Sequence, residues 1–127
     1  MRLLLDTHIF LWWADHPEKL SQRMLSALED ETNELLLSVA SVWEMQIKIQ
    51  LGKLKLSLPL ETLIKNQQET NALSLLPVTL DYVLALGPLP FHHKDPFDRL
   101  LIAQAHEDDL TLVSTDTQFS LYSVKLL

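Results

Sequence analysis

The chain has 127 residues, 47% of them hydrophobic, which is enough for a single domain over residues 1–127 with a buried core. Its net charge of −7 argues against a general polyanion binder, and its lack of cysteine excludes disulfides and thiolate metal sites. Any metal must therefore be held by oxygen or imidazole ligands, which favours hard divalent ions. No apolar run is long enough to span a membrane and no signal-peptide pattern is present, so we expect a cytoplasmic protein.

Short apolar runs alternate with amphipathic segments along the chain. The runs suit strands buried on both faces, as in a parallel sheet, at 2–5, 34–38, 73–78, 111–114 and 123–127. Helical patterns are found at 8–14, 18–29, 39–51, 60–71, 79–86 and 96–108. This alternation predicts a three-layer α/β/α sandwich with a central, mainly parallel sheet, whose ligands gather beyond the carboxyl ends of its strands.

Two acidic residues come at the ends of predicted strands. Asp6 follows the run 2–5 directly, and Asp116 closely follows the run 111–114. Parallel strands end at one rim of a sheet, so we expect the two carboxylates to share that rim. Either residue is also suited to begin a helix as its N-cap, and that alternative stays open for each one alone.

Two further acids begin the helix predicted at 96–108. Pro96 suits the first helical position, which makes Asp95 the N-cap and places Asp98 in the first turn. Asp95 therefore has a structural role. Asp98 would point over the rim that carries the strand-end acids, because the rest of the helix is apolar and expected to be buried, and we predict a functional role for it.

Glu44 lies within the helix predicted at 39–51. We predict that this helix buries an apolar stripe made of Val39, Val42, Trp43, Ile47 and Leu51. Glu44 lies at the border of the stripe, one turn before Lys48. The spacing alone favours an ordinary surface pair between these two side chains.

The acidic residues indicate a function more clearly as a group than one by one. Asp6, Glu44, Asp98 and Asp116 come from four separate elements that an α/β/α fold can bring to one rim. Packed there without counterions, they would repel and desolvate one another. Mg²⁺, or Mn²⁺, removes that penalty and bridges to phosphate groups of a substrate.

The segments that carry these acids resemble those of PIN-domain nucleases, most closely the VapC-type ribonuclease toxins of bacterial toxin–antitoxin pairs. The segments are "LLLDTHIFLWW", "SVASVWEMQIKIQLGKLKL", "LPFHHKDPFDRLLIAQA" and "LVSTDTQF", and the likeness spans essentially the whole chain. It implies a Rossmann-like sheet, metal-dependent cleavage of RNA, a cognate antitoxin and a toxin that is usually a homodimer. By motif it matches Asp6, Glu44, Asp98 and Asp116 to the acidic quartet of the family.

The resemblance leaves two positions outside the family pattern. Asp95 matches no position of the quartet and remains a helix cap or a group behind the metal ligands. His8 stands where the wider family has a small polar residue, and its role is open.

We expect hydrolysis of a phosphodiester by a metal-activated water, leaving 5′-phosphate and 3′-hydroxyl ends. Asp6 and Asp98 would bind the principal Mg²⁺, and Glu44 and Asp116 would complete the shell directly or through water. Three hydroxyl residues adjoin the strand-end acids and either orient water or serve as local caps. They are Thr7, Ser114 and Thr115.

Contacts to RNA need positive side chains near the acids. The candidates for substrate binding are Lys48, His93, Lys94 and Arg99. Arg99 is preferred among them because its guanidinium fork matches phosphate. The adjacent histidines at 92–93 are alternative metal ligands, although a carboxylate site favours hard ions over imidazole coordination. Of Trp12 and Trp13, we expect at least one to form a dimer or antitoxin contact, because aromatic side chains are enriched in interfaces.

Two other classes of function compete with a nuclease. Asp6 at a strand end is also the position of a nucleophile in aspartyl-phosphate phosphatases and phosphotransferases, although His8 stands where their second acid would act. A non-enzymatic metal-binding interaction module is the other alternative. Mg²⁺-dependent cleavage of RNA distinguishes the nuclease from both.

Overall fold

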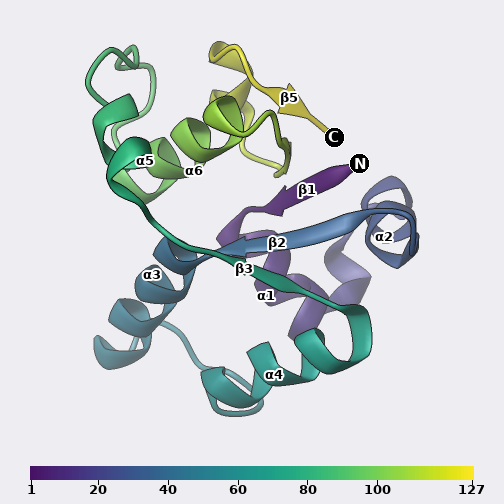
Figure 1. The fold of residues 1–127 in the computed structure, drawn as a ribbon. Coiled ribbons are helices and arrows are strands. Elements are labelled where there is room, and N and C mark those ends of the chain that lie inside the picture. Colours follow the sequence, from purple (N-terminus) through teal and green to yellow (C-terminus); the bar gives the residue numbers. More distant parts are fainter.

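The computed structural model describes residues 1–127 and shows an α/β fold with five parallel strands flanked by helices (Figure 1). The strands are β1 (Arg2–Leu5), β2 (Glu34–Ser38), β3 (Ser74–Leu76), β4 (Thr111–Val113) and β5 (Lys125–Leu126). The helices are α1 (Thr7–Asp15), α2 (Gln22–Glu29), α3 (Val39–Gln50), α4 (Leu60–Asn71), α5 (Leu80–Ala85) and α6 (Pro96–Glu107), with 3-10 turns η1 (Pro17–Lys19) and η2 (Thr117–Leu121). None of the helices combines the length and hydrophobicity that crossing a bilayer requires.

The predicted fold class is confirmed, and the strands lie in the order β3-β2-β1-β4-β5, all parallel. The strand order reverses beside β1, because β2 and β3 lie on one side of it and β4 and β5 on the other. The carboxyl ends of β1 and β4 therefore meet at the switch point, where open α/β sheets bind their ligands.

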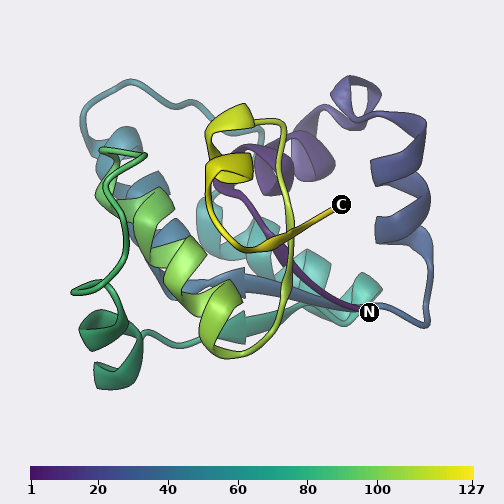
Figure 2. The ribbon, with the colours of Figure 1, turned by 90° about the horizontal axis from the view of Figure 1, so that it is seen from above.

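The central strands β1, β2 and β4 are buried on both faces, as their apolar runs predicted. The edge strands β3 and β5 are half-buried or exposed, so the same prediction is wrong for them. In β1, Leu3 and Leu5 belong to one core cluster and Leu4 to the other, and all three side chains are fully buried. The first cluster lies against α1, α2 and α4, and the second lies against α6 and η2. Seen from above, α6 runs across the sheet with η2 beside it (Figure 2).

One predicted helix differs from the structure in a way that the sequence explains. The segment 18–29 divides into η1 and α2, because Pro17 begins the short turn and Ser21 caps a new helix by accepting the N–H of Met24 at 3.1 Å. The turn η2 was not among the predicted helices, although Asp116 was recognised as a residue that could begin one. Asp116 begins it by accepting the N–H of Gln118 at 2.9 Å.

Candidate metal centre

An open cavity of about 320 Å³ lies at the switch point of the sheet. Asp6 follows β1, and its backbone N–H donates to the carbonyl of Val113 at the end of β4, with an N–O distance of 3.0 Å. The cavity is lined by Asp6, His8, Trp12, Glu44, Lys48, Asp95, Asp98, Thr115 and Asp116. Five of these nine side chains are carboxylates, so the cavity has a strongly negative potential that attracts cations.

Asp6 is held by the residues that follow the neighbouring strand. Its side chain is only 5% exposed, and the hydroxyl of Ser114 donates to its Oδ2 at 2.6 Å. The same hydroxyl accepts the N–H of Asp116 at 3.0 Å, which couples the two strand-end acids. Burial raises the pKa of Asp6 above its ordinary value, although the Ser114 hydrogen bond and the charge of His8 act in the opposite direction.

Glu44 is buried beside Asp6 rather than exposed at the surface. The hydroxyl of Thr7 donates to its Oε1 at 2.7 Å, and the Nζ of Lys48 lies 3.2 Å from its Oε2. The predicted pair between Glu44 and Lys48 therefore forms, but inside the cavity. Thr7 is itself 2% exposed, and its hydroxyl holds the glutamate in place.

The predicted apolar stripe of α3 is wrong at three of its five positions, since only Val42 and Ile47 are half-buried. Val39, Trp43 and Leu51 are 43%, 64% and 62% exposed, and the buried face consists of Ala40, Ser41, Glu44 and Met45. α3 contacts both α1 and α6, and its face with small and polar side chains packs against these two helices. Trp43 instead packs edge-on against Phe97 of α6, with ring centroids 5.3 Å apart.

The first turn of α6 has the arrangement that its sequence predicts. The Oδ1 of Asp95 accepts the N–H groups of Phe97 and Asp98, at 2.8 and 3.1 Å, so Asp95 is the N-cap. Asp98 projects into the cavity. Burial, together with the charges of Asp6 and Asp95, raises the pKa of Asp98 to about 7, against an ordinary value of 3.8.

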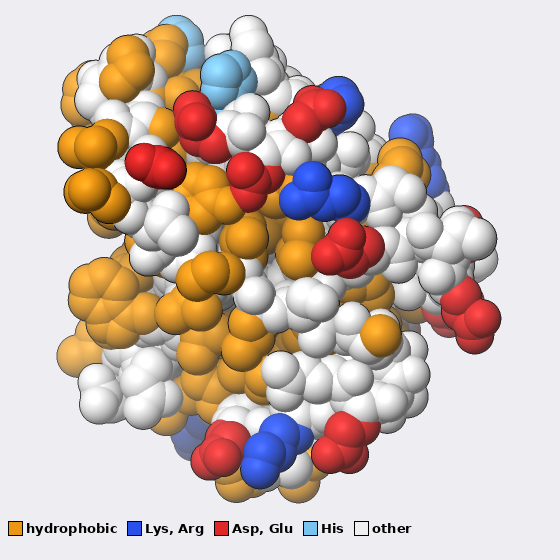
Figure 3. Space-filling model, in the orientation of Figure 1, with side chains coloured by type: hydrophobic (Ala, Val, Ile, Leu, Met, Phe, Trp, Pro, Cys, Tyr) orange, Lys and Arg blue, Asp and Glu red, His pale blue; other side chains and the backbone are white.

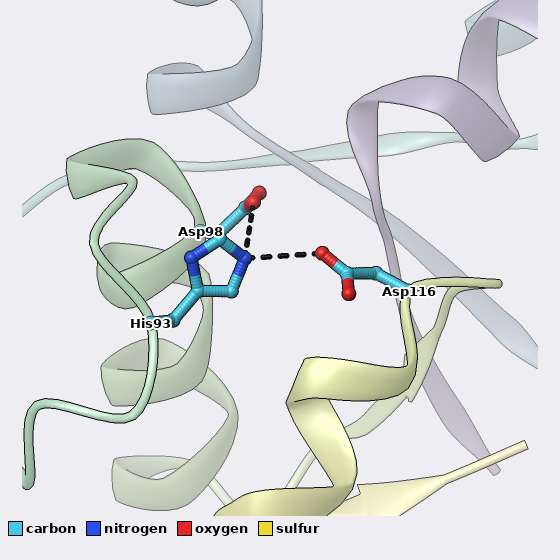
Figure 4. A group of neighbouring side chains, drawn as sticks. All are labelled: His93, Asp98 and Asp116. Atoms are coloured by element: carbon cyan, nitrogen blue, oxygen red, sulfur yellow. Dashed lines mark hydrogen bonds and ion pairs between the residues drawn. The ribbon is translucent and has the colours of Figure 1, made fainter.

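His93 lies between two of the acids (Figure 4). Its side chain is buried, and its Nε2 is 3.0 Å from the Oδ2 of Asp98 and 3.0 Å from the Oδ2 of Asp116. Burial opposes ionisation of Asp116, but the N–H of Gln118 and the ring of His93 outweigh it and lower the pKa of Asp116. His93, predicted to bind substrate or alternatively a metal ion, therefore lies buried between two acids of the site.

The prediction that Arg99 contacts phosphate is also wrong. The side chain is 7% exposed, and its guanidinium donates to the carbonyl oxygens of Pro90, Leu89 and Leu86 at 2.8, 3.3 and 3.5 Å. The ring of Phe91 covers the guanidinium, 4.1 Å from its central carbon. Arg99 therefore fastens the loop before α6, because its donors are occupied by backbone carbonyls.

The remaining predicted residues lie at or near the cavity. Lys48 and Thr115 line it, and Lys94 is exposed on the loop that leads to α6. Trp12 was not predicted to line the site, although its position four residues after His8 puts both on one face of α1. Trp13 is half-buried against the first core cluster.

A larger cavity, of about 460 Å³, lies on the other side of the loop before α6. Its lining includes His92, His106 and Glu107 among mainly apolar residues, and it holds no cluster of carboxylates. The ring of His92 packs edge-on against Tyr122 with centroids 5.2 Å apart, away from the acids. His92 is thus not a metal ligand, and the chemistry belongs to the smaller, acidic cavity.

The acidic cavity has the donor set of a site for a hard divalent cation. Its carboxylates come from four elements and have too few positive partners, since only Lys48 forms an ion pair with one of them besides the His93 contacts. Oxygen ligands with open positions suit Mg²⁺ or Mn²⁺. Such an ion would offset the burial and the repulsion from neighbouring acids that raise the pKa of Asp98.

Comparison with known sequences gives two matches. The PIN domain family matches residues 3–125 of the chain. Ribonuclease VapC22 of Mycobacterium tuberculosis (strain ATCC 25618 / H37Rv) is 30% identical over 115 residues, which are 90% of this chain and 86% of that protein.

Comparison with solved structures supports the same fold. VapBC2 from Rickettsia felis, solved bound to a DNA fragment from its promoter, aligns with a TM-score of 0.74 at 17% identity and covers 100% of this chain and 98% of that chain. VapBC-1 from nontypeable Haemophilus influenzae aligns with a TM-score of 0.63 at 18% identity, covering 100% and 97%. At these identities the likeness concerns the fold.

Proposed function

The chain belongs to the PIN domain family, and on that premise we propose that it is a Mg²⁺-dependent endoribonuclease, the toxin of a toxin–antitoxin pair. The observation that carries the proposal is the convergence of Asp6, Glu44, Asp98 and Asp116 on one cavity at the sheet's switch point. The 30% identity of the chain to a VapC ribonuclease supports RNA as the substrate.

Asp6 and Asp98 hold the principal ion in this proposal. Burial raises the pKa of both carboxyl groups, and neighbouring acids add to the shift, so a cation would favour their ionised forms. The Oδ1 of Asp98 makes no hydrogen bond, which leaves it free for a cation. Glu44 and Asp116 complete the shell from the two sides. When bound, the ion supplies Lewis acidity towards water and towards the scissile phosphate.

Other residues in or around the cavity position these acids and the RNA. Thr7 and Ser114 donate to Glu44 and Asp6 and hold each carboxylate in one orientation. Lys48 is the cation nearest the acids and is placed to contact an RNA phosphate at the cavity mouth. Lys94, exposed on the neighbouring loop, extends this positive contact. Hydrolysis leaves 5′-phosphate and 3′-hydroxyl ends.

We extend the proposal to the partners, a cognate antitoxin and a second copy of the toxin. The similar VapBC proteins were solved as complexes. Hydrophobic side chains gather on this chain along the edge where α3 and α5 lie (Figure 3). On or next to these two helices, four hydrophobic side chains are each more than 60% exposed, namely Trp43, Leu51, Leu80 and Leu84. A patch of this kind suits a protein interface.

The test is cleavage of RNA by the purified chain in Mg²⁺ and in EDTA, with Asp98→Asn as the matched control. We expect cleavage only by the wild type and only with Mg²⁺, and sequencing of the ends should find 5′-phosphates. Equal cleavage by both proteins would refute the mechanism. Binding of Mg²⁺ without cleavage of any RNA would favour a non-enzymatic metal-binding module instead.

A further inference from the structure

The backbone around His93 is fastened to the rest of the molecule at several points. The hydroxyl of Tyr122 accepts the N–H groups of His92 and His93, at 3.0 and 2.8 Å, and donates to the carbonyl of Pro90 at 2.8 Å. Arg99 holds the preceding part of the same loop. These hydrogen bonds hold the backbone at His93 in one position, although the residue lies in a loop.

The hydrogen bonds of the His93 ring favour one of its two tautomers. The backbone N–H of Asp95 donates to its Nδ1 at 3.1 Å. Because a backbone N–H can only donate, Nδ1 carries no proton, and in the imidazole the proton is on Nε2. That N–H points between Asp98 and Asp116, whose Oδ2 atoms both lie 3.0 Å from Nε2 (Figure 4).

This arrangement distinguishes two roles for His93. The Nε2 and the two carboxylate oxygens lie within 4.8 Å of one another, a spacing that would suit a metal ion with three ligands. A metal ion bound at Nε2 would, however, displace the proton of that nitrogen to Nδ1, because a neutral imidazole keeps one N–H. The nitrogen that has a free lone pair, Nδ1, is already occupied by the N–H of Asp95.

We propose that His93 is a positioning residue, which holds Asp98 and Asp116 at a fixed separation through its Nε2–H and does not itself bind the metal ion. This inference rests on the proposed metal-dependent function. The two carboxylates repel each other, and they come from α6 and from the segment after β4, which the ring of His93 bridges. With each Oδ2 held by His93, Oδ1 of Asp98 stays directed to the cation.

The inference is tested by binding of Mn²⁺ alone, measured by isothermal titration calorimetry on the full chain. The variant His93→Phe keeps a ring against Phe119 but loses the donor, and we expect its Mn²⁺ affinity to fall by about 10- to 100-fold, as for other groups that orient metal ligands. His93→Gln retains an N–H donor near the position of Nε2 and should restore much of the affinity. His92→Phe is the matched control and should bind as the wild type does.

A second measurement separates positioning from coordination. The ¹⁵N spectrum of His93 should show a protonated Nε2 both before and after addition of Mg²⁺, whereas a ligand would lose that proton. If His93→Phe does not fold, Tyr122→Phe, which loosens the loop without changing an acid, should still weaken Mn²⁺ binding.

Three results would overturn the inference. They are unchanged Mn²⁺ affinity in the folded His93→Phe or Tyr122→Phe protein, loss of the Nε2 proton on adding Mg²⁺, and absence of Mn²⁺ binding by the wild type. The third result would refute the proposed function as well, whereas the first two would leave it intact.

Discussion

Replacing Asp98 with asparagine should stabilise the metal-free protein while abolishing its activity. Burial and the neighbouring acids raise the pKa of Asp98 from 3.8 to about 7 in the folded protein. Each unit of raised pKa corresponds to about 1.4 kcal/mol. Ionised Asp98 therefore lowers the free energy of unfolding by at most roughly 4 kcal/mol at alkaline pH. Because Asp98 is partly accessible to solvent, we reduce this figure to about 2 kcal/mol.

The sign of the pH dependence follows from which state holds the proton more tightly. The folded protein binds the Asp98 proton more tightly than the unfolded chain does, so this group contributes most favourably below about pH 4. This contribution to the free energy of unfolding is lost as the pH rises through about 7. At higher pH it does not change further, because Asp98 is then ionised in both states. The advantage of Asp98→Asn should therefore be about 2 kcal/mol at pH 8 and should decrease towards zero as the pH falls to about 4 and below.

Urea unfolding in EDTA, followed by tryptophan fluorescence at several pH values, measures this difference. Mg²⁺ should reverse the order of the two proteins, because an ion at 100 times its Kd stabilises the folded state by about 2.7 kcal/mol and asparagine weakens its binding. A variant that is no more stable than the wild type at pH 8 in EDTA would show that Asp98 carries no such penalty.

Three further substitutions probe other parts of the site. Arg99→Met should lower the free energy of unfolding by about 2 to 3 kcal/mol, because the loop carbonyls lose their charged donors. In the inactive Asp98→Asn background, the same substitution should leave the salt dependence of RNA binding unchanged. In the same background, Lys48→Met should weaken RNA binding and reduce its salt slope by about 1, as filter binding at several KCl concentrations would show; an unchanged slope would argue against a phosphate contact. Thr7→Val removes the donor to the buried Glu44 and should cost about 1 to 3 kcal/mol in urea unfolding and lower kcat; wild-type stability and kcat would contradict a role for that hydrogen bond.

Local sequence determined where several strands and helices lie and which acids follow the carboxyl ends of the strands. The leucine runs predicted β1 and β2 with the bounds that the structure has, and α4 was predicted as residues 60–71, because these segments have a clear periodicity or an unbroken apolar character. The cap at Asp95 was predicted from its neighbour Pro96. Acids that follow parallel strands must lie at one rim, so the placement of Asp6 and Asp116 also followed from the sequence.

Only the tertiary structure decided which side chains of the other elements face that rim. The apolar residues of α3 predicted the wrong buried face, because α1 and α6 pack against its small and polar residues and leave Trp43 to pack on Phe97. Arg99 was expected at a phosphate, but the loop folds back over it and supplies carbonyl acceptors. His93 lies between two carboxylates because that loop is fastened to Tyr122, which is far away in the sequence. Such contacts depend on how separate elements pack, and local patterns of charge and hydrophobicity do not contain that information.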